Sequence, residues 1–162
     1  MSTSYFATFV NAEYEGALAN ADAESIEEVM NGFMESHAES LLFGTESNYW
    51  MLAAVLDYFN ECEAFPYLGS ARGERLGGLT ESVVLYVPSD EVASVLVACN
   101  SADPRKEKES FREKTLNWFK EVRPDWEIDN DDDFEDLMAN VTGLLSALDT
   151  AEKNGLGLLV VV

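Results

Sequence analysis

The sequence predicts an α+β (or small α/β) fold, with a small sheet of about three or more strands packed by about six helices. Three observations lead to this prediction. The chain has 162 residues, a length that favours one compact domain over residues 1–162. Its apolar fraction of 47% is enough for a substantial core and excludes a disordered chain. Short apolar runs typical of strands alternate with longer segments of helical periodicity.

Three segments have the composition of strands. Residues 5–10 (YFATFV) are aromatic and β-branched. Residues 83–87 (VVLYV) form a second run that ends at Pro88. The run LLVVV at 158–162 is continuously apolar, which indicates a strand in the interior of a sheet. The glycine-rich stretch from Pro66 to Leu79 is expected to be irregular.

The first half of the chain predicts three helices. A short helix is expected over residues 12–19, and a second begins at Ser25, which forms a capping box with Glu28. Residues 46–60 predict a third helix with apolar side chains nearly all round. Such a helix is usually central and covered on more than one face.

The second half predicts three more helices, each with a capping residue. Ser89 is expected to cap a helix whose buried stripe contains Cys99. Asp103 is expected to cap the next helix, with Pro104 at its first position. Asp133 is expected to cap the last one, whose apolar side chains recur at helical spacing from residue 134 to residue 148.

The charge distribution is strongly uneven. The formal net charge is −21, and residues 1–71 contain twelve acids and no Lys or Arg. Residues 125–153 contain ten acids and one Lys, whereas residues 104–124 contain seven bases and four acids. Direct binding of nucleic acid is disfavoured because affinity for phosphate comes from Lys and Arg. Adsorption to an anionic membrane is disfavoured for the same reason, so any partner is expected to be a basic protein.

Targeting and redox signals are weak. No run approaches the ~18 apolar residues that a membrane span needs. The first residues lack a cationic segment followed by an apolar one, so no secretory signal is predicted. The two cysteines, Cys62 and Cys99, form no Cys-x-x-Cys pair and predict no disulfide scaffold. A reducing, cytoplasmic setting is therefore expected.

The residues that usually perform catalysis are scarce. His37 is the single histidine, so a Ser-His-Asp or Cys-His relay would depend on it alone, and a zinc site with two histidines is excluded. His37 lies near a predicted helix end, where the helix dipole stabilises a cation, and this is a sufficient structural reason for a histidine that is not catalytic. The sequence therefore indicates no catalytic residue, no metal and no cofactor, and favours a protein that is not an enzyme.

The acidic run before the last predicted helix resembles the start of a calcium-binding loop. Asp129, Asp131 and Asp133 occupy the first, third and fifth positions of such a loop. The likeness then ends, because Phe134 stands where glycine is needed and Asn140 where a bidentate glutamate is needed. Helix capping is the better explanation of the cluster, with Asp133 as the cap and Glu135 and Asp136 in the first turn, and clustered carboxylates favour weak cation association over specific calcium binding. The candidate residues for a surface that engages a partner are Trp126, Asp129, Asp131, Asp132 and Asp133.

The glycine-rich stretch contains the only bases of the first hundred residues. Arg72 and Arg75 flank Gly73, and glycine backbone with two guanidinium groups is able to hold an anion. These three residues are the candidate ligand-binding residues. A loop with two solvated arginines is the simpler interpretation.

Several segments together resemble a known family. A strand runs into Pro88-Ser89-Asp90-Glu91-Val92, and Pro124-Asp125-Trp126 follows a helix that contains Phe111. A long amphipathic helix then ends at Lys153-Asn154-Gly155 before a final apolar strand. With the opening strand and the Trp50 helix, this pattern resembles the YfbM-like family of uncharacterised bacterial proteins, a domain of unknown function. The resemblance implies a compact single domain and transfers no catalytic residue.

These observations favour an acidic, soluble, non-catalytic domain that engages a basic protein partner. One alternative is a small enzyme, or an anion-binding or other ligand-binding protein, that uses the Gly/Arg loop 66–79. Another is an immunity or anti-defence protein that imitates the charge of nucleic acid. The oligomeric state is left open.

Overall fold

The computed structural model describes residues 6–11, 15–17, 20, 25, 28–29, 49–70, 83–125 and 131–161. Its labelled elements, in chain order, are β1 (Phe6–Val10), α3 (Tyr49–Glu61), β2 (Tyr67–Ser70), β3 (Val83–Val87), α4 (Val92–Ser101), α5 (Lys108–Val122), α6 (Asp131–Asn154) and β4 (Gly157–Val161). The fold is α+β, as the sequence predicts.

The four strands form one antiparallel sheet in the order β1-β4-β3-β2. The predicted interior position of the last apolar run is confirmed, because β4 pairs with β1 on one side and β3 on the other. The expectation of irregular structure from Pro66 onward is wrong for β2, which pairs with β3 through Tyr67 and Tyr86. Its four residues include a glycine, so the pairing with β3 stabilises a strand that local composition does not signal.

Both faces of the sheet bury side chains. Leu85, Leu158 and Val160 belong to the main core, which also contains the inner faces of the helices. Because side chains alternate along a strand, Val84 and Leu159 point to the opposite face, and they are also buried. The central strand therefore lies between two covered faces, which explains why its sequence is continuously apolar instead of alternating.

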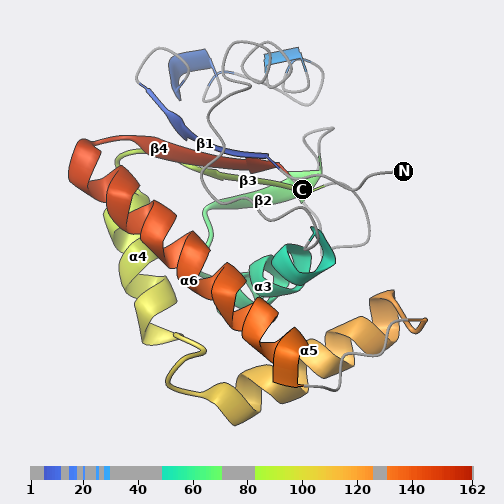
Figure 1. Ribbon diagram of the computed structural model, residues 1–162. Coiled ribbons are helices and arrows are strands. Elements are labelled where there is room, and N and C mark those ends of the chain that lie inside the picture. Colours follow the sequence, from blue (N-terminus) through green and yellow to red (C-terminus); the bar gives the residue numbers. More distant parts are fainter. Residues whose placement is uncertain are drawn as a thin grey trace.

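The helices α3, α4 and α6 lie against one face of the sheet, and α5 lies farther from it (Figure 1). The prediction of a central third helix is confirmed, since every residue from 51 to 59 is buried. The end of α6 that leads into β4 lies near the sheet, whereas its beginning lies beside α5 (Figure 1).

The starts of two helices differ from the sequence prediction. Ser89 does not cap α4; its backbone N–H and its hydroxyl both donate to the Glu15 carboxylate, the hydroxyl at 2.8 Å. Asp103 does not cap the following helix either, because α5 begins four residues after Pro104. A carboxylate distant in sequence therefore holds the turn between β3 and α4, and the segment after Asp103 forms a separate turn.

Gly157 allows the Glu15 carboxylate to approach the sheet closely. A Cβ at this position would lie 2.9 Å from the Val87 carbonyl oxygen and 3.1 Å from Glu15 Oε1. Both distances are shorter than ordinary van der Waals contact, so any larger residue would displace backbone or the carboxylate. Glycine at the start of β4 thus permits the contact that joins Glu15 to Ser89.

Candidate interaction surface

The beginning of α6 concentrates negative charge in one and a half turns of helix. Five of its first six residues are acids, and we call this group the acidic end of α6. Its members are Asp131, Asp132, Asp133, Glu135 and Asp136. Negative side chains are favourable there because the helix dipole places partial positive charge at its N-terminus.

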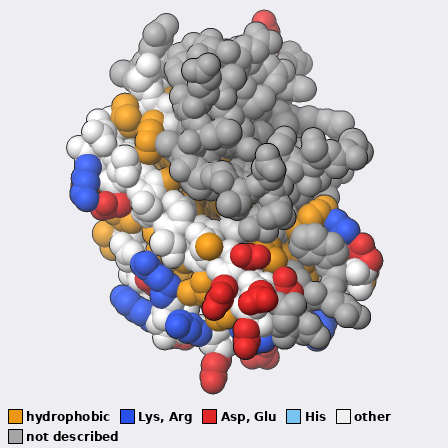
Figure 2. Space-filling view, in the orientation of Figure 1, with side chains coloured by type: hydrophobic (Ala, Val, Ile, Leu, Met, Phe, Trp, Pro, Cys, Tyr) orange, Lys and Arg blue, Asp and Glu red, His pale blue; other side chains and the backbone are white. Residues whose placement is uncertain are grey.

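The carboxylates of the acidic end face solvent while the opposite side of the same helix is buried. Asp131, Asp132, Glu135 and Asp136 are exposed and Asp133 is half-buried, whereas Leu137 is 1% exposed. Figure 2 shows Asp and Glu side chains gathered low on this face, over the region where α6 begins in Figure 1. The packed inner side of α6 thus holds a set of charges at fixed spacing.

One arginine offsets part of this charge. Arg112 on α5 lies 3.5 Å from Asp131, Nη1 to Oδ1, and its guanidinium carbon lies 5.3 Å from the centre of the Phe134 ring. The Asp131 side chain is 94% exposed, so the pair is solvated and contributes little attraction. The acidic end therefore keeps most of its negative potential.

A second acidic feature lies in the core helix α3. Asp57 is 9% exposed, and burial together with repulsion from Glu61 and Glu121 raises its pKa to about 6. Neither an ion pair nor a hydrogen bond within the described ranges compensates this carboxylate. Asp57 therefore changes charge just below neutral pH.

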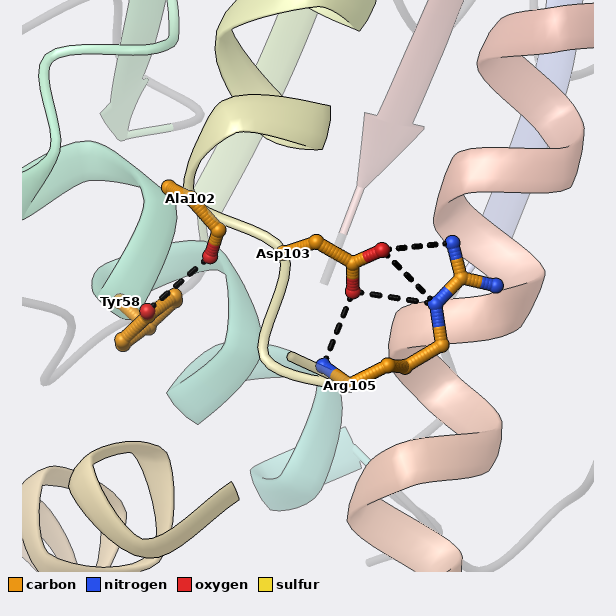
Figure 3. A network of polar contacts seen from close by, with 4 residues as sticks. All are labelled: Tyr58, Ala102, Asp103 and Arg105. Carbon is orange, nitrogen blue, oxygen red and sulfur yellow. Dashed lines mark hydrogen bonds and ion pairs between the residues drawn. The ribbon is translucent and has the colours of Figure 1, made fainter. Parts of the chain in front are cut away.

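The turn between α4 and α5 contains a bound carboxylate (Figure 3). Arg105 donates to Asp103 from Nε and Nη2 and from its backbone N–H, at distances of 2.8–3.0 Å. These hydrogen bonds lower the pKa of Asp103. Nearby, the Tyr58 hydroxyl donates to the Ala102 carbonyl oxygen at 3.0 Å and joins α3 to the end of α4. This network holds the turn between α4 and α5 against the end of α3.

The predicted site residues have different outcomes. The structure brings Asp131, Asp132 and Asp133 together in the first turn of α6. Asp133 lies within the helix and is not its cap, because α6 already begins at Asp131. The remaining candidates lie outside the described residues: Arg72, Gly73, Arg75, Trp126 and Asp129, as well as His37.

Two further features of the described ranges concern metals and membranes. No three side chains among the described His, Cys, Asp and Glu residues are arranged to hold a metal ion. None of the described helices combines the length and apolar character required to cross a bilayer.

Comparison with known proteins gives no match to a family model, a curated protein or a solved structure. The resemblance to the YfbM-like family therefore stays a prediction.

The sequence prediction did not identify the raised pKa of Asp57 or the hydrogen-bonded pair formed by Asp103 and Arg105. Asp57 differs from the other acids in being the one charged residue in the otherwise uncharged run from 49 to 60, and that isolation is a usable signal. Asp103 and Arg105 carry a weaker signal, since an acid two residues before an arginine occurs at many surface turns.

Proposed function

We propose that this protein is a non-catalytic binding domain whose acidic end of α6 docks on a basic surface of another protein. One observation carries the proposal: four exposed carboxylates lie on consecutive turns of a helix that is packed into the core on its other side. Rigid charges cost little conformational entropy to engage, and a negative patch speeds the approach of a positive one.

The charge of the whole chain supports the same mechanism. At −21, the protein attracts cationic proteins over a distance of about 10 Å at 0.1 M salt. Long-range attraction speeds association but gives no specificity, however. The proposal therefore requires that the acidic end contribute more to the binding affinity than the same number of acids elsewhere on the surface.

A matched pair of variants separates local recognition from net charge. In the first, Asp131, Asp132, Glu135 and Asp136 are changed to their amides. In the second, four other exposed acids are neutralised in the same way: Glu61, Glu63, Glu121 and Glu152. Both variants gain the same four units of charge.

Binding is measured with a linker histone and with poly-lysine as basic probes, at 50 and 300 mM salt. We expect the first variant to lose about tenfold more histone affinity than the second. The reason is that each of its four changes removes a short-range contact between a carboxylate and a basic group of the partner. Higher salt should weaken binding of the unaltered protein. Equal losses in the two variants would show that net charge alone governs binding and would refute a docking role for α6.

A further inference from the structure

The outer face of α4 carries no charge, in contrast to the outer faces of α5 and α6. The helix has the sequence VASVLVACNS, without a single ionisable acid or base apart from a buried cysteine. Val92, Val95 and Cys99 face the core. Val97 on the other side is 66% exposed, and it is the one exposed large hydrophobic residue within the described ranges.

The exposed positions of α4 are symmetric about Val97. They lie at offsets of −4, −3, +3 and +4 from it and are Ala93, Ser94, Asn100 and Ser101. The Ser101 hydroxyl donates to the Val97 carbonyl oxygen at 2.9 Å, which turns it back onto its own helix. A stripe with this symmetry can pack on an antiparallel copy of itself, because positions three and four apart form the ridges of helix packing.

The charges at the two ends of α4 also suit a second copy. Asp90 and Glu91 are exposed just before the helix, and the exposed Lys106 and Lys108 follow it, with Glu107 between them. Neither lysine forms an ion pair with any residue the structure describes. Figure 2 shows Lys and Arg side chains low on the left, where the turn after α4 lies in Figure 1.

We infer that two copies of this chain associate through an isologous, antiparallel contact of α4 with α4, with Val97 at the twofold axis. In that arrangement the acids before one helix lie opposite the lysines after the other, and the two helix dipoles oppose each other favourably. A homodimer through this face requires no change of the surrounding fold. It also leaves the acidic end of α6, on a different helix, available for a partner.

One helix face is a small interface, so the dimer is expected to dissociate in the micromolar range or more weakly. Each copy carries −21, and mutual repulsion opposes association at low ionic strength. Raising the salt from 20 to 200 mM should therefore strengthen the dimer, whereas it weakens the binding of a basic protein. The opposite response to salt distinguishes the two interactions.

Sedimentation equilibrium of the full chain from 1 µM to 1 mM tests the inference. Val97→Glu should weaken dimerisation at least tenfold, and Thr142→Glu, which introduces the same glutamate at an exposed position of α6, should not. Both positions are exposed and helical, so both variants should keep the circular dichroism spectrum of the parent protein. A chain that stays monomeric at 1 mM, or equal weakening by both changes, would refute the inference.

Charge reversal tests the proposed orientation. Glu91→Lys and Lys106→Glu should each weaken the dimer more than the control changes Glu152→Lys and Lys120→Glu, and the double reversal should restore it. Failure of the double variant to recover would exclude the antiparallel register.

A disulfide provides a readout that tolerates weak association. In a Cys62→Ser background, Val97→Cys should form a covalent dimer under mild oxidation much faster than Thr142→Cys, because a residue near a twofold axis meets its own copy. Equal rates for both would contradict a contact centred on Val97. Histone binding by the Val97→Glu variant should be unchanged, so the failure of either proposal leaves the other intact.

Discussion

Helix α5 lies between two short sequences that mirror each other, Asp-Pro-Arg at 103–105 and Arg-Pro-Asp at 123–125. Each forms an ion pair between an arginine and an aspartate two residues away. The distances from Nη2 to Oδ2 are nearly equal, 2.8 Å at the first site and 2.7 Å at the second. The environments are opposite, because the side chain of Asp103 is 5% exposed and that of Asp125 is 64% exposed.

The difference leads us to expect that burial, and not the distance between the two charged groups, sets how much each pair contributes to stability. At the first site the carboxylate is buried and accepts a backbone N–H as well as the guanidinium. At the second the guanidinium is the less exposed partner and lies 4.8 Å from the centre of the Trp50 ring. Loss of Asp103 removes a buried side chain that accepts a backbone N–H in the turn, whereas loss of Asp125 removes an exposed carboxylate and leaves an arginine that still lies on an aromatic ring.

The largest effect is expected for Asp103→Ala. The change removes the buried carboxylate that accepts the Arg105 backbone N–H and its guanidinium, and we expect the free energy of unfolding to fall by about 2 kcal/mol. Urea unfolding at pH 7 measures it. Because its folded pKa lies below the ordinary value of 3.8, Asp103 stabilises the fold above that value, and this contribution disappears as the pH falls through the folded pKa.

Asp103→Asn is the control for this prediction, since an amide oxygen still accepts the Arg105 backbone N–H. It should lose less than the alanine variant. If Asp103→Ala and Asp125→Ala were equally destabilising, burial would not account for the difference between the two ends of α5.

A smaller effect of opposite sign is expected for Asp57→Asn. Asp57 extends the comparison to a buried carboxylate that forms no ion pair within the described residues. The folded state disfavours charge on Asp57, so the stability that this group provides below pH 4 is lost as the pH rises to about 6. At pH 8 the amide should raise the free energy of unfolding by about 1 kcal/mol.

Thermal melts from pH 4 to 8 test the sign. The melting temperatures of the parent and the Asp57→Asn variant should converge below pH 4 and separate above pH 6. Parallel curves over this range would contradict a raised pKa at Asp57.

The smallest effect is expected for Asp125→Ala. Arg123 holds the pKa of Asp125 below its ordinary value, but exposed pairs contribute little to stability because solvent and salt screen them. The melting temperature should change by no more than the experimental error at 300 mM salt. A clear destabilisation that persists at this salt concentration would mean that the outer pair also anchors α5.

The sequence predicted the elements whose hydrophobic pattern is long or pure. The strand at 83–87 matches β3, and the helical spacing from residue 134 onward lies within α6. Cap assignments were less successful, because a Ser or Asp before a helix has competing partners. Ser89 bonds to Glu15, far away in the chain, and Asp103 bonds to Arg105. Local sequence cannot rank such partners, since tertiary packing decides which one is near.

The candidate interaction surface was predictable only in part. Asp131 and Asp132 were identified as members of the acidic run before the predicted helix, and the structure places them within the first turn of α6 itself. The raised pKa of Asp57 could not be predicted, because it depends on burial in the folded core and in part on Glu121, which a different helix contributes.

The position of β4 between β1 and β3 has a consequence for how the protein forms. Residues 6–10 pair with residues 157–161, the one strand neighbour of β1 within the described residues, so this pairing has to wait for synthesis of the intervening chain. Contacts so remote in sequence slow the search for the native topology. An apolar strand that waits for its neighbour is exposed to wrong pairing, and the abundant negative charge on the emerging polypeptide would keep such chains apart.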